Sequence, residues 1–141
     1  MQRILKLLTS LTVLLLTGQF NLVFASQPDV PLTIDYPSPI VSEFNFENDN
    51  NIYPDKSNFK ILNAITMSNT DGERWATLTI KNAASGRRIF KSGHILALFA
   101  DGNRAYPLSE DQTFDAKETI SLTLQFSNNS FPILKLYTRS N

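Results

Sequence analysis

The sequence predicts an all-β fold, an antiparallel sandwich of about seven short strands, and three observations lead to it. From residue 59 onward, apolar and polar side chains alternate with a period of two, which places them on opposite faces of a strand. Turn signals containing glycine separate these runs at the short spacing typical of antiparallel sandwiches. No window of the chain shows a sustained helical period.

Residues 1–25 have the layout of a secretory signal peptide. Arg3 and Lys6 form a short positive region, Leu7–Leu16 is apolar, and small residues precede a cleavage point ahead of Ser26. A retained membrane anchor is the alternative, but polar residues at positions 19 and 21 interrupt the apolar stretch that a spanning helix needs. We therefore expect a cleaved chain without a membrane span, located in the periplasm or secreted.

The mature chain is expected to be nearly neutral, and it contains no cysteine. Removing Arg3 and Lys6 from 13 basic residues leaves 11 against 13 acidic residues, a net charge of about −2. This balance provides neither bulk attraction for nucleic acid nor a polybasic patch for a membrane surface. A small exported domain without disulfides depends on its core alone, and the lack of cysteine favours a bacterial envelope protein.

Residues 26–58 are expected to form an extended, acidic, proline-rich arm. Each proline fixes φ and removes a backbone donor, so long regular strands are not expected there. We predict one short edge strand near Leu32–Ile34, another near Glu43–Phe46, and a loop over residues 45–55. The arm holds one basic residue, Lys56, with five prolines (Pro28, Pro31, Pro37, Pro39, Pro54) and six acidic residues (Asp29, Asp35, Glu43, Glu47, Asp49, Asp55).

Residues 59–141 form the predicted sandwich domain, and the alternation of apolar and polar side chains along the chain predicts its strands. Residues 94–100 are apolar on both faces and predict a central strand, whereas residues 131–139 predict the last strand. Hairpin turns are expected at Asp71-Gly72, Ser85-Gly86 and Asp101-Gly102, because glycine tolerates the positive φ that such turns require. Three runs have one predicted inward face each: Phe59, Ile61, Ile65 and Met67 (with Asn63 as a polar interruption); Ala76, Leu78 and Ile80; and Ile120, Leu122, Leu124 and Phe126.

Four strand-and-turn motifs follow one another in the second half of the chain. They read TLTIKN (residues 77–82), HILALFADGNRAYPL (94–108), FDAKETISLTLQF (114–126) and FPILKLY (131–137). This order resembles that of immunoglobulin-like accessory domains of bacterial envelope proteins, although here residues 115–118 form a turn that in the family often contains glycine. The resemblance covers roughly residues 74–137; it implies an immunoglobulin-like β-sandwich and carries over no functional residue.

The stretch SGRRIFKSGHILALFADG (residues 85–102) contains Arg87, Arg88 and Lys91 together with the chain's one histidine. One interpretation is an anion-binding or partner-binding edge, because guanidinium groups match carboxylate and phosphate geometry. Another is an ordinary strand whose charges prevent edge-to-edge pairing. A third is that the acidic arm lies along Lys60–Arg104, which holds seven basic residues against three acidic ones.

Catalytic and metal sites lack a complete set of residues in this sequence. One histidine, His94, without cysteine does not supply the three or four ligands of a zinc site, and no serine has a nucleophile-elbow pattern. Residues 47–55 offer oxygen ligands for calcium but lack the glycine and closing glutamate of an EF-hand loop. Two carboxylate pairs, Asp71 with Glu73 and Asp111 with Asp115, remain as acid/base candidates. We predict no enzyme activity, no cofactor and no metal.

Trp75 falls on the polar face of its strand, where an exposed indole would stack on a sugar ring or anchor a protein partner. In immunoglobulin-like folds a strand tryptophan is more often buried.

The preferred function is a non-enzymatic binding or accessory module that contacts another envelope or secreted protein, with the arm adding a strand to an open sheet edge. A carbohydrate-binding sandwich using Trp75 is the alternative, and a small hydrolase with a carboxylate pair is the third hypothesis.

Overall fold

The computed structural model describes residues 29–35, 46, 52–108 and 110–140, and within them the chain is almost entirely β-structure. The all-β prediction is therefore confirmed. Seven strands have four or more residues: β3 (Phe59–Ser68), β4 (Arg74–Asn82), β5 (Arg88–Lys91), β6 (Leu96–Phe99), β8 (Asp111–Phe114), β9 (Thr119–Gln125) and β10 (Ile133–Tyr137). The other described elements are two-residue strands, β1 (Thr33–Ile34), β2 (Lys56–Ser57), β7 (Arg104–Ala105) and β11 (Arg139–Ser140), and a short 3-10 helix, η1 (Ser92–His94).

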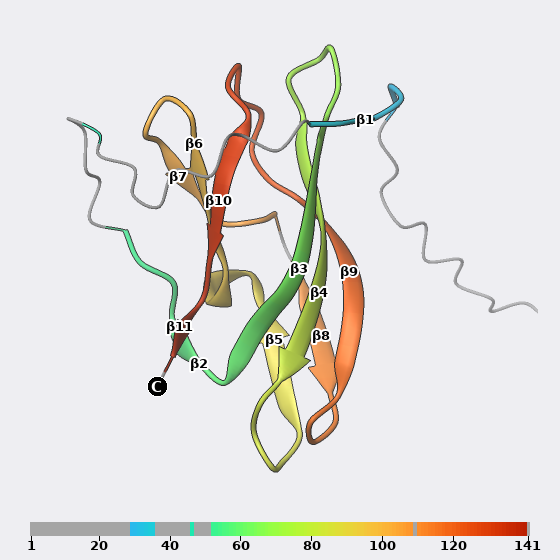
Figure 1. Cartoon of the computed structure of the whole chain (residues 1–141), viewed down its shortest axis with the longest axis vertical. Helices are drawn as coiled ribbons and strands as arrows, with labels where there is room; N and C mark the ends of the chain where they lie inside the picture. Colours follow the sequence, from blue (N-terminus) through green and yellow to red (C-terminus); the bar gives the residue numbers. More distant parts are fainter. Residues whose placement is uncertain (1–28, 36–45, 47–51, 109, 141) are drawn as a thin grey trace, which may run out of the picture.

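The strands form four groups, of which two are the main sheets. A four-stranded sheet has the order β1-β3-β4-β9 and a three-stranded sheet the order β10-β6-β7, and every pairing in them is antiparallel. Figure 1 shows these sheets on either side of the molecule, with the antiparallel ribbon β5-β8 towards one end. The short strands β2 and β11 pair in parallel and bring the end of the arm next to the carboxyl terminus.

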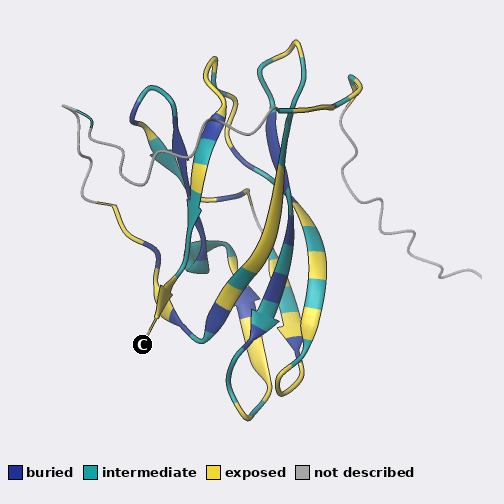
Figure 2. Ribbon diagram, viewed as in Figure 1, coloured by how far each residue is buried: buried dark blue, intermediate teal, exposed yellow. Residues whose placement is uncertain are grey.

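One apolar core lies between the two main sheets and is closed by the β5-β8 ribbon. The residues predicted to face inward on β4, namely Ala76, Leu78 and Ile80, are fully buried in it. On β9 the predicted face is also confirmed: Leu124 is buried, whereas Ile120 and Leu122 pack against the core but are only partly covered (Figure 2). The ribbon contributes Phe90 and Phe114, whose rings pack around Phe59.

The inward face predicted for residues 59–67 is wrong beyond Ile61, because β3 contains a β-bulge. Ile61 pairs with Ile80, but Asn63 pairs with the next residue of β4, so Leu62 is the extra residue. A bulge of one residue exchanges the two faces of all that follows. Ile65 consequently lies opposite Thr77 on the outer face and is 40% exposed.

Two of the three predicted glycine hairpins are present. Gly72 and Gly102 have φ values of 79° and 84°, and they connect β3 to β4 and β6 to β7. Ser85-Gly86 does not form a hairpin, because the strands on either side of it are not paired with each other. β4 belongs to the four-stranded sheet, whereas β5 pairs with β8. The turn between β8 and β9 uses Lys117 at a φ of 60°, where the resembled family often has glycine.

The buried side chain of Asn82 holds the β4–β5 and β8–β9 connections together. Its Nδ2 donates hydrogen bonds to the carbonyl oxygens of Gly86 (2.9 Å) and Asp115 (2.8 Å). Its Oδ1 accepts a hydrogen bond of 3.0 Å from the backbone N–H of Ala84. The asparagine that ends the TLTIKN motif thus has a structural role, since it satisfies backbone groups of two turns.

The predicted signal peptide at residues 1–25 and most of the predicted strand at residues 43–46 lie outside the described residues. The other strand predicted in the arm is present as β1, which pairs with the end of β3 through Thr33↔Ser68 and Ile34↔Met67. A short edge strand was therefore correctly expected within Leu32–Ile34.

Candidate functional site

The three predicted anion-binding residues lie on β5 (Arg88, Lys91) or directly before it (Arg87), and they do not converge. Arg87 forms a 2.9 Å salt bridge with Asp115, and both side chains are largely exposed, so the pair contributes little to stability. Arg88 donates to the backbone oxygen of Arg87, and Lys91 lies opposite Asp111 in the register. Because Arg88 and Lys91 are three residues apart on a strand, they point to opposite faces. This geometry favours the interpretation as a charged, solvated ribbon.

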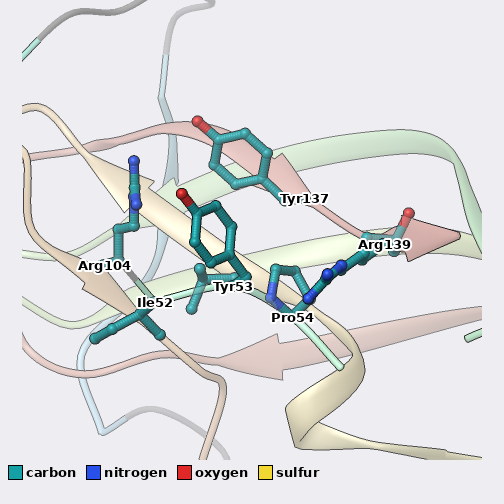
Figure 3. A pocket seen from close by; sticks show the side chains of 8 residues that line it. Ile52, Tyr53, Pro54, Arg104, Tyr137 and Arg139 are labelled. Atoms are coloured by element: carbon teal, nitrogen blue, oxygen red, sulfur yellow. The ribbon is translucent and has the colours of Figure 1, made fainter. Parts of the chain in front are cut away.

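The second face of β6 is covered by the arm. Ala97 and Phe99 belong to the core, whereas Leu96 and Leu98 point to the opposite face of the β10-β6-β7 sheet and are each 1% exposed. Residues 52–54 of the arm, labelled in Figure 3, line one cavity together with Leu96. The sequence had predicted a strand that is apolar on both faces, and such a strand needs cover on both sides.

Two contacts hold the described parts of the arm against this sheet. The hydroxyl of Tyr106 donates a 2.9 Å hydrogen bond to the backbone oxygen of Tyr53. The ring of Phe46 lies 3.0 Å from the position that a Cβ at Gly102 would occupy, so the β6–β7 turn needs glycine for this contact as well as for its φ. The described parts of the arm therefore contact their own domain on the β10-β6-β7 sheet, through contacts that do not join the arm's acidic residues to the basic residues of Lys60–Arg104.

The acidic residues of the arm that the structure describes have separate roles. Asp35 accepts a 2.6 Å hydrogen bond from the hydroxyl of Ser68, next to β1. The backbone N–H of Asp55 donates to the oxygen of Gly93 (2.8 Å), and its carboxylate lies where a side chain at Gly93 would be. Glu43, Glu47 and Asp49 lie outside the described residues.

His94 is a structural residue at the end of η1. Its Nδ1 accepts a 3.0 Å hydrogen bond from the backbone N–H of Lys91, and its ring contacts Phe59 and Phe90. Partial burial lowers the pKa of the His94 imidazole; Asp55 opposes this effect, Lys91 adds to it and Asp111 opposes it. A neutral ring that accepts a backbone hydrogen bond is not arranged as a catalytic base or a metal ligand.

A cavity of about 250 Å³ lies between the arm and the β10-β6-β7 sheet. Leu96 and Tyr137 line it from the sheet, and residues 52–54 line it from the arm. Figure 3 shows Arg104 at one end and Arg139 at the other, with the rings of Tyr53 and Tyr137 between them. The Arg104 guanidinium lies 6.0 Å from the centre of the Tyr53 ring, within cation–π range.

Sequence reasoning missed this cavity. Its walls come from residues 52–54, 96, 104 and 137–139, which are distant in the chain and carry no recognisable motif. The signal available was the two-faced apolar strand at residues 94–100, which required an apolar covering segment. Ile52, Tyr53 and Pro54 provide the apolar part of the described arm nearest to it.

Trp75 is only 5% exposed, so the interpretation as an exposed platform for a sugar ring is wrong. The indole does lie on the outer face, as the alternation predicted, opposite Met67 and Gln125. Its Nε1 donates a 3.3 Å hydrogen bond to Glu73. Trp75 is thus a buried residue outside the main core cluster.

The proposed carboxylate pairs do not form an acid/base site. Glu73 accepts hydrogen bonds from Asn69 and Trp75, which gives it a structural role beside the β3–β4 turn. Asp111 and Asp115 are four residues apart along extended chain, which separates them by about 13 Å, beyond the spacing of catalytic carboxyl pairs. Within the described residues, no group of three histidine, cysteine or acidic side chains is placed to hold a metal ion. The calcium candidate at residues 47–55 lies mostly outside them.

Comparisons of the chain with protein-family models, curated proteins and solved structures give no match. Among the described residues, no helix has the length and apolar character needed to cross a membrane.

The outer edge of β9 is the longest regular strand edge left open in the described part of the chain. β9 pairs with β4 through all seven residues without a register shift. Among the described residues, its other edge has a backbone partner at Gln125 alone, from the N–H of Leu108. Figure 1 shows β9 as the outermost strand of its sheet. From Thr119 to Gln125 it contains no charge and no proline.

Proposed function

We propose that the chain is an exported, non-enzymatic binding module with an immunoglobulin-like sandwich fold, which contacts another envelope protein by accepting an extended strand at the outer edge of β9. The fold proposal is supported by two main antiparallel sheets that share one core with the β5-β8 ribbon. The exported location rests on the signal-peptide layout of residues 1–25.

The open edge of β9 is the observation that carries the binding proposal. Proteins usually protect an exposed edge with charges, prolines or bulges, because its unpaired backbone groups accept a further strand. β9 has none of these features between Thr119 and Gln125. Its inward residues Ile120 and Leu122 are only partly buried, so an added strand would cover them as well as satisfy the backbone.

The other edges are less suited to a partner strand. β3 carries Lys60 and the bulge at Leu62, and β1 already occupies its far end. β10 is shorter and contains Lys135 and a register shift. Since β1 is itself a piece of the arm paired with a sheet edge, strand addition already occurs within this molecule.

A site-specific photo-crosslinker at Ser121 tests this function in cells that express the full chain. Ser121 is exposed on β9, and the matched control is a crosslinker at Thr113, which is exposed on β8. We expect one discrete adduct from Ser121, recovered in the periplasmic or secreted fraction, and none from Thr113. Thr123→Lys should remove the adduct because a charge at a strand edge opposes pairing, whereas Thr113→Lys should leave it. Equal labelling at both positions, or an adduct that survives Thr123→Lys, would contradict the proposal.

A further inference from the structure

The cavity under the arm has a positively charged wall and an apolar interior. Its lining contains two arginines, Arg104 and Arg139, and no acidic residue. Asp55 follows the lining residue Pro54, but its carboxylate is turned towards Gly93. Apart from Thr138, the remaining lining residues are aliphatic or aromatic, so the cavity combines a mostly apolar body with cationic ends.

The two arginines differ in what they already contact. Arg104 lies beside the Tyr53 ring. The exposed Arg139 side chain makes no hydrogen bond or ion pair with the described residues. Arg139 is held in place through its backbone, since β11 pairs with β2 at Lys56. Its backbone is therefore held beside the cavity, and its guanidinium, which lines the cavity, is available to a carboxylate.

The volume limits the ligand to a small molecule. An apolar cavity of about 150 Å³ holds a benzene ring, and the volume here is about 250 Å³. A single ring with a short carboxylated side chain is therefore the size that fits. Tyr53 and Tyr137 lie along the space that the ring would occupy (Figure 3), and aromatic pairs in such contact favour offset or edge-to-face packing.

We propose that this cavity binds a small carboxylate with an aromatic or apolar ring, with the ring over Leu96 between the two tyrosines and the carboxylate at Arg139. The site lies on the β10-β6-β7 sheet and is separate from the β9 edge, so it goes beyond the strand-binding function and stands without it. Binding would join the arm to the sheet, because residues 52–54 form one wall and Leu96 and Tyr137 form the other.

Titration of the ¹⁵N-labelled mature chain with phenylacetate, followed by two-dimensional NMR, tests the site. The uncharged isostere 2-phenylacetamide is the ligand control. We expect saturable shifts at the amides of Tyr53, Leu96 and Thr138, with a dissociation constant on the order of 1 mM for a ligand of this size. The amide should bind at least fivefold more weakly because it lacks the charge.

Two variants distinguish specific binding in the cavity from non-specific attraction of the phenylacetate anion to surface arginines. Arg139→Gln should weaken phenylacetate binding about fivefold or more, whereas Arg88→Gln, which changes an exposed arginine on β5, should not change it. Dispersed spectra of both variants will show that they are folded. Shifts that fail to saturate, an amide that binds as well as the acid, or equal effects of the two variants would each overturn the proposal.

Discussion

His94 lies next to the residue through which the domain contacts the end of the arm. Its Nδ1 accepts the backbone N–H of Lys91, and the neighbouring Gly93 accepts the backbone N–H of Asp55. The hydrogen bond to Nδ1 requires a neutral imidazole, since a protonated ring has no acceptor. Burial accordingly lowers the pKa of His94 relative to its value in the unfolded chain.

This lowered pKa predicts that the protein loses stability in mild acid. As the pH falls through about 6.5, the unfolded chain binds a proton at His94 before the folded protein does, so the free energy of unfolding decreases towards the folded-state pKa. The charged groups that act on the His94 ring are Asp55, Lys91 and Asp111. Urea unfolding at a series of pH values should show this decrease, and His94→Gln should flatten it. An identical pH dependence in both proteins would contradict the prediction.

At the scale of elements, the alternation of polar and apolar residues correctly predicts the inward face of strands that are buried on one side. It does not predict the inward face where apolar residues stand on both sides of the strand. β4 and β9 were read correctly because Thr and Ser alternate with Leu and Ile along them. The bulge in β3 was missed because Leu62 and Ile65 are apolar whichever way they point. The hairpin expected at Ser85-Gly86 failed because a local turn signal does not specify which sheet the next strand joins.

The turn between β8 and β9 provides a prediction at the same scale. Lys117 has a φ of 60°, a conformation that costs a residue with a Cβ about 1 kcal/mol relative to glycine. Both Lys117→Gly and Lys117→Ala remove the side-chain hydrogen bond to the oxygen of Ala83, but only glycine relieves the backbone. We expect the glycine variant to be about 1 kcal/mol more stable than the alanine variant in urea unfolding. If alanine is as stable as glycine, this turn is not under strain.

At the scale of the whole molecule, the cavity and the arm contacts could not be predicted from the sequence because they join segments about 40 to 85 residues apart. Residues 52–54 meet Leu96 and Tyr137 only after the β10-β6-β7 sheet has formed. The period of two specifies which side of a strand is apolar, but it does not specify what covers that side. The prediction of an extended arm was therefore compatible with docking on the domain itself or on a partner.

The arm contributes to stability as the cover of the β10-β6-β7 sheet, and its removal tests that role. Deleting residues 26–54 from the mature chain should expose Leu96, now 1% exposed, together with part of Tyr137. Exposing one large aliphatic and part of one aromatic side chain should lower the free energy of unfolding by about 3 kcal/mol, measured by urea unfolding. Deleting residues 26–35 alone, which removes β1 but keeps residues 52–54, should lower it clearly less than the longer deletion does. If the longer deletion leaves the unfolding curve unchanged, the arm is not part of the folded domain, and the cavity that it covers would not exist in solution.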